Sequence, residues 1–498
     1  MYARHSSNPV SLSYVAALRG VTPRQPGESF SYADLTCAEP DLLACLAASN
    51  PEGRFFGLVA DENARAGAAA NAELRGVTNV SFLAGSPQTL LAQIVAGSAA
   101  LPTLDYLVCD ESAHDLTAAD RKAAFAVAEK LLNPCGLLNY SYRAYGSDDG
   151  ALRFLVRELA PEMDAQQAKE FLTEVKKLGG AFLGKHKDIA LKLDAAIAKQ
   201  KPDEFFEHFA SGEAHSGSFD AVVALHPRGF TFAGSADIAS NYIELSVPAE
   251  TQKVIADCAK SALYEQVKDY ALDRTLRSDV WVRQPVTQTG NLATLFGGFT
   301  YGITRSREQV PTSVDAHGKH IDLNTPVFSK LIDLLALMPA GIGDFLSHPN
   351  GAGFAATEVV GAMQILVACG IAQPMRAVCM TNDITNVVQP RLVGGFNRYL
   401  DKMPINGGEL YLSSAVLGGA VAISARDALV MQALERAGLA NSVSALLPEL
   451  ERLAKNPAVA ARVMDVAEPT AEIARDMIQD VVSRSIVQWY AYGLLEAA

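Results

Sequence analysis

Residues 32–85 alternate short apolar stretches with helical repeats, and this alternation constrains the fold more than any other feature of the chain. Apolar residues recur at three- and four-residue spacing between the stretches, which predicts amphipathic helices. Asn50-Pro51 and Gly53 end the first of these helices. The expected strands are 33–35, 55–59 and 80–83, and the expected helices are 42–47 and 63–74. Short strands that alternate with helices predict a parallel sheet with crossover helices.

The same order continues after Gly85. Residues 87–97 predict a helix, 104–110 a fourth strand, 118–132 a long helix and 134–142 a fifth strand. In a parallel sheet of this kind, ligands bind beyond the carboxyl ends of the strands. We therefore expect a binding site at residues 36–40 and 60–63.

Length and composition limit the class of protein. A chain of 498 residues exceeds what one hydrophobic core supports, so two to four domains are expected. A formal charge of −13 argues against nucleic acid or an anionic membrane as partner. The seven cysteines form no C-x-x-C pair, which favours reduced thiols, a cytoplasmic location and no metal site. No apolar run is long enough to span a bilayer.

The turn after the first strand reads Asp34-Leu35-Thr36-Cys37-Ala38-Glu39-Pro40. Together with the strand order, it resembles the front half of a class I S-adenosylmethionine-dependent methyltransferase. That family has a Glu/Asp-x-Gly-Cys-Gly-x-Gly loop here. Asp34 and Cys37 match it, and all three glycines are absent. The position at which the family has its ribose-binding carboxylate corresponds to Val59 in this chain, and the carboxylate of Asp61 comes two residues later.

Three further stretches narrow the resemblance: LDYLVCDESAHDLT, LLNPCGLLNYSYRAYG and VKDYALDRTLRSDVWVR. They are similar to methyltransferases with an appended methyltransferase-regulatory domain, including the rickettsial lysine methyltransferases of outer-membrane proteins. In that subfamily the fifth strand leads into a Ser-Tyr-Asn-Thr-Tyr-Pro-Gly-like loop over the active site, which Ser141, Tyr142 and Tyr145 match. We interpret Arg274 and Arg277 as structural residues that pair with carboxylates between helix and sheet.

The resemblance implies S-adenosylmethionine as the cofactor, with its loss as the alternative. The catalytic candidates are Tyr142 and Tyr145, which could line the acceptor pocket or pack at the edge of the sheet. The candidate cofactor-binding residues are Asp34, Thr36, Ala38, Asp61, Ser86 and Asp110. We expect the loop at 36–40 to shrink or reshape the cofactor pocket, because each missing glycine adds a Cβ.

The last third of the chain predicts three helices, at 328–338, 342–346 and 357–369, followed by a short strand. This order is typical of a winged-helix-like module. The third helix carries no Lys or Arg, so we expect it to pack on protein and not to read DNA. A protein substrate or partner protein is therefore expected, and a homodimer is one option.

The expected fold is α/β: a Rossmann-like class I methyltransferase sheet (1–150), a helical linker with an α+β middle domain (151–310), and a mainly helical, winged-helix-like C-terminal region (311–498). Two functions follow from the resemblance. One is methyl transfer to a protein lysine. The other is a catalytically silent relative that acts as a scaffold or regulatory partner, which the lost glycines and the displaced carboxylate favour.

Overall fold

The structure is a computed structural model of the chain. It describes residues 2–3, 7–22, 27–99, 101–110, 116–144, 186–198, 218–249, 264–272, 276–286, 292–305, 307–316, 319–376, 390–403, 410–437, 443–455 and 470–497, and the single positions or pairs 24, 164, 166–167, 169–170, 173, 252, 255–256, 274 and 405.

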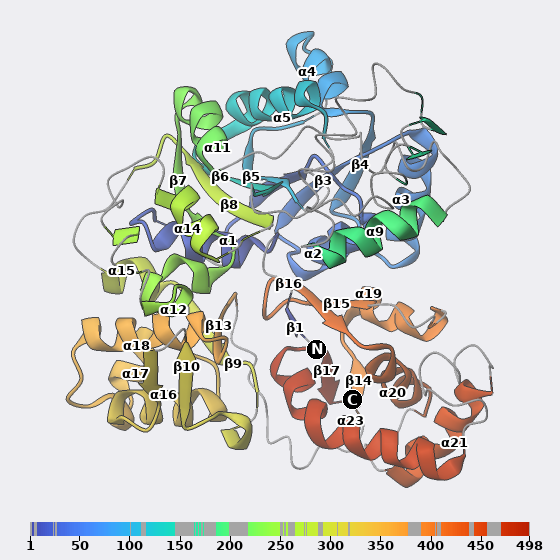
Figure 1. The fold of residues 1–498 in the computed structure, drawn as a ribbon. Helices are drawn as coiled ribbons and strands as arrows, with labels where there is room; N and C mark the ends of the chain where they lie inside the picture. The colour runs from blue at the N-terminus through green and yellow to red at the C-terminus, as the bar shows by residue number, and fades with distance from the viewer. Residues whose placement is uncertain are drawn as a thin grey trace.

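A seven-stranded sheet forms the centre of the molecule, in the order β4-β3-β2-β5-β6-β8-β7 (Figure 1). Its strands are β2 (Phe30–Asp34), β3 (Gly53–Val59), β4 (Val80–Ala84), β5 (Leu104–Cys109), β6 (Leu132–Arg143), β7 (Phe230–Ser235) and β8 (Leu276–Arg283). Strands β2 to β6 are parallel, and β8 runs antiparallel to both β6 and β7. The expected mostly parallel sheet is confirmed.

Helices cover both faces of this sheet, as a parallel sheet requires. One face carries α1 (Pro9–Ala17), α2 (Pro40–Ser49) and α3 (Glu62–Leu74), whose buried side chains share a core with the inward residues of β2, β3 and β5. The other carries α5 (Ala118–Leu131) and α11 (Ser218–Leu225), with α4 (Pro87–Val95) beside α5. The helices expected between the first five strands are thus all present.

Two expectations need correction at the second half of the sheet. The apolar stretch 219–232 predicts a strand followed by a turn, but Ser218–Leu225 forms helix α11 and the strand β7 begins at Phe230. The sheet also extends past the boundary expected at residue 150, because β7 and β8 are its last two strands. Strand β8 pairs with β6 over seven consecutive residue pairs, so the two segments share one sheet.

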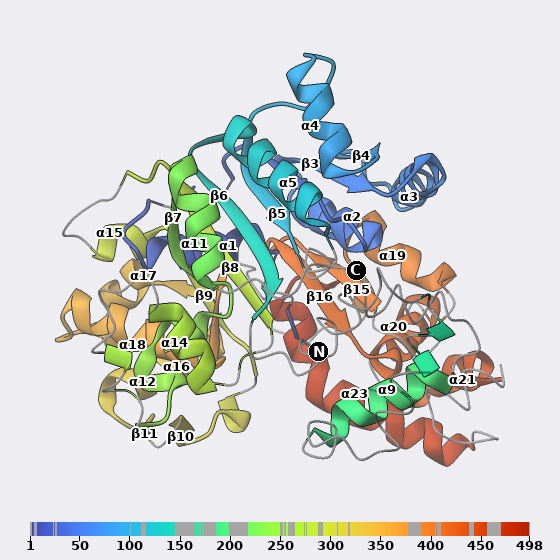
Figure 2. The same ribbon diagram turned by 45° about the horizontal axis from the view of Figure 1, so that its top comes forward.

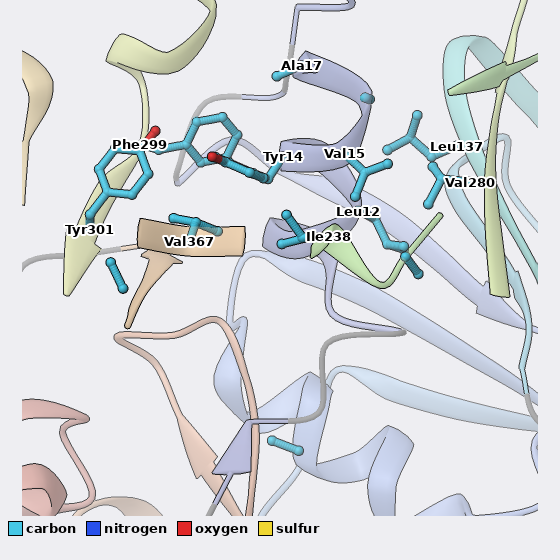
Figure 3. Close-up of a cluster of buried hydrophobic side chains, with 14 of the residues drawn as sticks. Leu12, Tyr14, Val15, Ala17, Leu137, Ile238, Val280, Phe299, Tyr301 and Val367 are labelled. Atoms are coloured by element: carbon cyan, nitrogen blue, oxygen red, sulfur yellow. The ribbon is translucent and has the colours of Figure 1, made fainter. Parts of the chain in front are cut away.

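Helix α1 is buried on all sides, which explains why its sequence shows no polar face. Figure 3 shows its side chains between two groups of residues. Leu12 and Val15 lie toward Leu137 and Val280 of the sheet, and Tyr14 lies toward Phe299 and Tyr301. The ring of Tyr14 meets those of Phe299 and Tyr301 edge-on, at centroid distances of 5.3 and 6.3 Å. Helix α1 therefore joins the sheet to the next part of the chain.

That next part comprises residues 292–376, which we call the three-helix module after the three consecutive helices at 326–368. Its helices α16 (Pro326–Leu337), α17 (Ile342–Ser347) and α18 (Ala356–Ala368) confirm the three helices expected there. A short sheet in the order β12-β9-β13 joins Ala340–Gly341, Thr300–Ile303 and Ala372–Met375. The strand after the third helix thus pairs with β9, which precedes all three helices. The module also contains α15 (Leu292–Gly297) and the hairpin β10–β11 (Ser313–Ala316, Lys319–Asp322).

The third part is a C-terminal unit, residues 390–497 together with β1 (Tyr2–Ala3). Strand β1 pairs with β16 (Gly419–Ile423), which pairs with β15 (Leu410–Ser414). Strand β14 (Pro390–Leu392) pairs with β17 (Leu495–Ala497), and the helices are α19 (Gly394–Arg398), α20 (Ala425–Ala437), α21 (Val443–Ala454) and α23 (Ala471–Ala491). Figures 1 and 2 show the module and this unit side by side beneath the sheet.

None of the helices in the described part of the chain is long and apolar enough to cross a bilayer.

Candidate functional site

A cavity of about 670 Å³ opens at the carboxyl ends of β2, β3 and β4. The turn after β2 forms its floor, the first turn of α2 and the inner side of α3 form one wall, and the turn after β4 forms another. Apolar side chains are the larger part of its lining, among them Leu35, Leu58, Val59, Pro87 and Leu116. Its polar lining consists of Thr36, Asp41, Asn71, Ser86 and Asp120. The cavity lies where the strand pattern predicts a ligand site.

Thr36 connects the ends of β2 and β5 beneath this cavity. Its hydroxyl accepts a hydrogen bond from the backbone N–H of Asp110 at 2.9 Å. The Asp34 carboxylate accepts from the backbone N–H of Thr36 at 2.9 Å and from its hydroxyl at 3.3 Å. Asp110 in turn accepts from the Ser141 hydroxyl at 3.2 Å, which extends the network to β6. The three strand ends are therefore held together below the site.

Burial raises the pKa of Asp34 to about 7. The hydrogen bonds from Thr36 oppose that shift, and the nearby charge of Asp110 adds to it. A carboxyl group with this pKa gains or loses its proton near neutral pH. The protonation state of the network therefore changes with pH in the range where most enzymes are assayed.

The turn at 36–40 contains no glycine, yet it lies close against β3. Its Cys37 is buried, and burial raises the pKa of the thiol. A Cβ at Gly57 would lie 2.9 Å from Cys37 Sγ and 2.6 Å from Leu43 Cδ2, closer than real contacts allow. The small residue that permits the close approach is thus on the neighbouring strand and not in the turn. Pro40 begins α2 directly after this turn.

The predicted cofactor-binding residues divide into three groups. Thr36, Ala38 and Ser86 line the cavity, and Ser86 also accepts a hydrogen bond from Thr89 N–H as the N-cap of α4. Asp34 and Asp110 belong to the network beneath it. Asp61 instead caps α3, since its carboxylate accepts a hydrogen bond from the backbone N–H of Ala64 at 2.8 Å.

Three polar residues of the lining were missed from the sequence: Asp41, Asn71 and Asp120. Ala64, Ala68 and Asn71 recur at four- and three-residue spacing on α3, so they share the face that lines the cavity. That spacing is a signal that could have identified Asn71. Asp120 accepts hydrogen bonds from Thr117 and Gln88. Partial burial opposes ionisation of Asp120, but these hydrogen bonds outweigh it and lower its pKa.

Tyr142 lies in a different environment from the cavity. It is 1% exposed, stacks on Tyr140 at 5.1 Å and donates a hydrogen bond from its hydroxyl to Asp279 at 2.5 Å. Burial and the charge of Asp279 raise its pKa well above the usual value. The second catalytic candidate, Tyr145, lies outside the described residues.

Asp279 belongs to a buried ion cluster between α14 (Tyr264–Leu272) and β8. The cluster comprises Glu265, Lys268, Asp269, Arg274, Arg277 and Asp279, three cations and three carboxylates. The Arg277 side chain is completely buried and lies within 3.0 Å of Glu265, 2.6 Å of Asp269 and 2.8 Å of Asp279. These ion pairs between helix and sheet are the structural role expected for Arg274 and Arg277.

Among the residues that the structure describes, no group of three or more His, Cys, Asp or Glu side chains could hold a metal ion.

Comparisons with known proteins agree with this geometry. Over 99% of both chains, the structure matches PKMT2 from Rickettsia typhi with a TM-score of 0.66 and 14% identity. It matches the same protein in complex with AdoHcy with a TM-score of 0.67 and 15% identity, again over 99% of both chains. This chain has the class I methyltransferase fold. The strand order, with β8 antiparallel inside the sheet, belongs to that fold.

Two sequence comparisons add to this result. Residues 205–283 match the family model described as a predicted methyltransferase regulatory domain. An uncharacterised protein of Synechocystis sp. is 20% identical over 448 residues, which are 86% of this chain and 85% of that protein. The matched segment 205–283 includes β7, α14 and β8. The regulatory-domain match therefore covers the last two strands of the methyltransferase sheet and the buried ion cluster.

Proposed function

We propose that this protein binds S-adenosylmethionine in the cavity at the ends of β2, β3 and β4, and transfers its methyl group to a lysine of a protein substrate. The observation that carries the proposal is the cavity itself, which lies at the carboxyl edge of a class I methyltransferase sheet. Its volume of about 670 Å³ is within the usual range for small-molecule sites.

The chain's residues fit a nucleoside-containing cofactor. The apolar wall formed by Leu58, Val59 and Leu116 suits a flat base and excludes water. Thr36, Ser86 and Asn71 offer hydrogen-bonding groups, and the carboxylates of Asp41 and Asp120 suit a cationic ligand. When bound, S-adenosylmethionine supplies an activated methyl group whose transfer depends mainly on alignment of the reacting groups.

A lysine acceptor must lose its proton before it can react. The raised pKa of Tyr142 and its hydrogen bond to Asp279 argue against this tyrosine as the base. Within the proposal Tyr142 holds the end of β6 in place, and Tyr145 remains the candidate on the acceptor side. The three-helix module and the C-terminal unit would present the protein substrate.

A catalytically silent scaffold is the second candidate, and the structure offers a specific observation in its favour. The ribose position at the end of β3 is Val59, and the next carboxylate along the chain, Asp61, is used to cap α3. Losing a charge-assisted hydrogen bond costs about 1.5–3 kcal/mol, or roughly ten- to a hundred-fold in affinity. Cofactor binding is therefore expected to be weak in comparison with a site that keeps this carboxylate.

Calorimetric titration with S-adenosylmethionine and S-adenosylhomocysteine tests the proposal. Saturable binding of both is expected, and Ala64→Phe should abolish it because Ala64 lines the cavity. Ala70→Phe, on the exposed side of the same helix, is the matched control and should bind as the wild type does.

Transfer of tritiated methyl groups to poly-L-lysine then separates the two candidates. Incorporation supports the methyltransferase, and binding without incorporation supports the silent scaffold. If neither compound produces heat in the titration, the proposals of cofactor binding and of methyl transfer are both refuted.

A further inference from the structure

Helix α2 connects the cofactor cavity to the C-terminal unit. Its first residues, Pro40 and Asp41, line the cavity, and its last residue, Ser49, is completely buried against the β15–β16 hairpin. A helix of this length spans about 15 Å. The two ends are held by different sets of contacts, both of which involve residues more than 300 positions later in the chain.

The carboxyl end of α2 is held by buried hydrogen bonds. The Ser49 hydroxyl shares its proton between the carbonyl oxygens of Cys45 at 2.8 Å and Gly419 at 3.0 Å, and it accepts from the backbone N–H of Ser414 at 3.1 Å. Asn50 donates to the carbonyl oxygen of Gly418 at 2.9 Å. These bonds lie between buried groups, so a displaced hairpin would leave polar atoms unpaired.

The amino end of α2 is held through Arg75, the C-cap residue of α3. Its guanidinium lies 2.9 Å from the Asp41 carboxylate and is only 9% exposed, whereas Asp41 is 49% exposed. The same guanidinium lies 5.0 Å from the ring centroid of Phe396 and 5.6 Å from that of Tyr399, both in the C-terminal unit. Oδ1 of Asp41 accepts no hydrogen bond within the described part of the chain, so it remains available at the cavity.

We propose that Arg75 is a positioning residue through which the C-terminal unit sets the wall of the cofactor cavity. Phe396 and Tyr399 shield the guanidinium from water, and a shielded ion pair is screened less than an exposed one. The shielded pair fixes Asp41 and the first turn of α2 at the cavity. This inference rests on the proposed cofactor site. It adds that the C-terminal unit, which is remote in sequence, controls the affinity of that site for the cofactor.

Three variants separate this role from general stability. Arg75→Lys keeps the positive charge but loses the planar guanidinium, which can stack on the two aromatic rings and pair with the Asp41 carboxylate at the same time. Phe396→Leu and Tyr399→Leu each remove one ring, and Tyr399 is half-buried, so its variant is the milder one. The controls are Arg65→Lys, an exposed arginine on the same helix, and Phe354→Leu, whose ring faces Lys330 in the three-helix module.

The experiment measures the dissociation constant of S-adenosylhomocysteine by calorimetry and the exchange of α2 amides in the unliganded protein. Each of the three variants should weaken binding about three- to ten-fold and speed exchange at residues 42–46, and the controls should change neither. In a methyl-transfer assay the variants should raise KM for the cofactor and leave kcat unchanged.

The outcomes distinguish this inference from the proposed function. If the wild type binds the cofactor product and the three variants bind it equally well, the inference is overturned and the proposed function stands. If the wild type does not bind it, the proposed function fails. The amide exchange of the unliganded protein then still tests whether Arg75 positions α2. Exchange rates in the three variants that equal those of the wild type would overturn this role of Arg75. Faster exchange confined to α2 would support it.

Discussion

The proposed cofactor cavity and the buried ion cluster both gather carboxylates around the same sheet, but they differ in how far their charges are exposed. In the cavity, Asp41 is 49% exposed and pairs with one arginine. In the cluster, Arg277 is completely buried and pairs with three carboxylates. Perturbed pKa values alone would mark both as functional sites. The difference shows that enclosed, balanced charges hold segments together, whereas unbalanced charges at an open surface can recognise a ligand.

The charges in the cluster illustrate this balance. Burial would raise the pKa of Glu265, but the positive charges of Arg277 and Lys268 overcome it, and the pKa is lowered. Burial dominates for Lys268, whose pKa is lowered, and for Asp269, whose pKa is raised. Replacing one member of such a cluster leaves its partners buried without compensation.

The largest effect should come from Arg277→Met. Removing this guanidinium leaves Glu265, Asp269 and Asp279 without their shared partner, which we expect to cost about 3–5 kcal/mol of unfolding free energy. Urea denaturation measures this cost. Arg391→Met is the matched control, because its ion pair with Glu496 is exposed and should contribute at most about 1 kcal/mol. Equal midpoints for the two variants would show that the cluster is not structural.

Asp34→Asn should change how stability depends on pH. The folded pKa of Asp34, about 7, lies above its unfolded value, so ionisation opposes folding. This cost is absent below about pH 4, grows as the pH rises toward 7 and is complete above it, with an upper limit of about 4 kcal/mol.

The stability of Asp34→Asn relative to the wild type should therefore increase between pH 4 and pH 7. Urea midpoints at several pH values would show it. A constant difference across that range would mean that Asp34 has an ordinary pKa.

Tyr142→Phe tests whether this tyrosine belongs to the buried ion cluster or to the acceptor pocket of the proposed active site. The variant loses the hydrogen bond to the Asp279 carboxylate, which should cost about 1.5–3 kcal/mol of stability. A structural Tyr142 predicts an unchanged dissociation constant for S-adenosylhomocysteine. A fall in kcat at unchanged stability would instead place Tyr142 in the acceptor pocket.

The smallest effect is expected from Asp61→Ala. Losing the N-cap of α3 should cost about 0.5–2 kcal/mol of stability. We expect the affinity for S-adenosylhomocysteine to stay within about two-fold, because the carboxylate is committed to the helix. Asp61→Asn retains a capping side chain and serves as the control. Loss of binding in both variants would show that Asp61 leaves the helix to contact the ribose.

The fold of the first 143 residues could be predicted because its signal is local. Leu42, Leu43 and Leu46 recur at helical spacing, and residues 55–59 form an uninterrupted apolar run, so each element is encoded in its own segment. The position of the cavity followed from the same pattern, since the ends of parallel strands meet at one edge of the sheet. The helix at Ser218–Leu225 was missed because a short apolar run suits a strand equally well.

The sequence by itself determined the strand and helix order of the first 143 residues, the turn that forms the cavity floor and the absence of basic residues on α18. Only the tertiary structure decided that Asp61 caps a helix, that Tyr142 joins a buried ion cluster, and that Arg75 lies between Asp41 and two aromatic rings. The physical reason is that periodicity reports which face of an element is buried, not what it is buried against. Contacts such as that of Asp41 with Arg75, and of Arg75 with Phe396, join segments tens to hundreds of residues apart, and a local pattern carries no record of them.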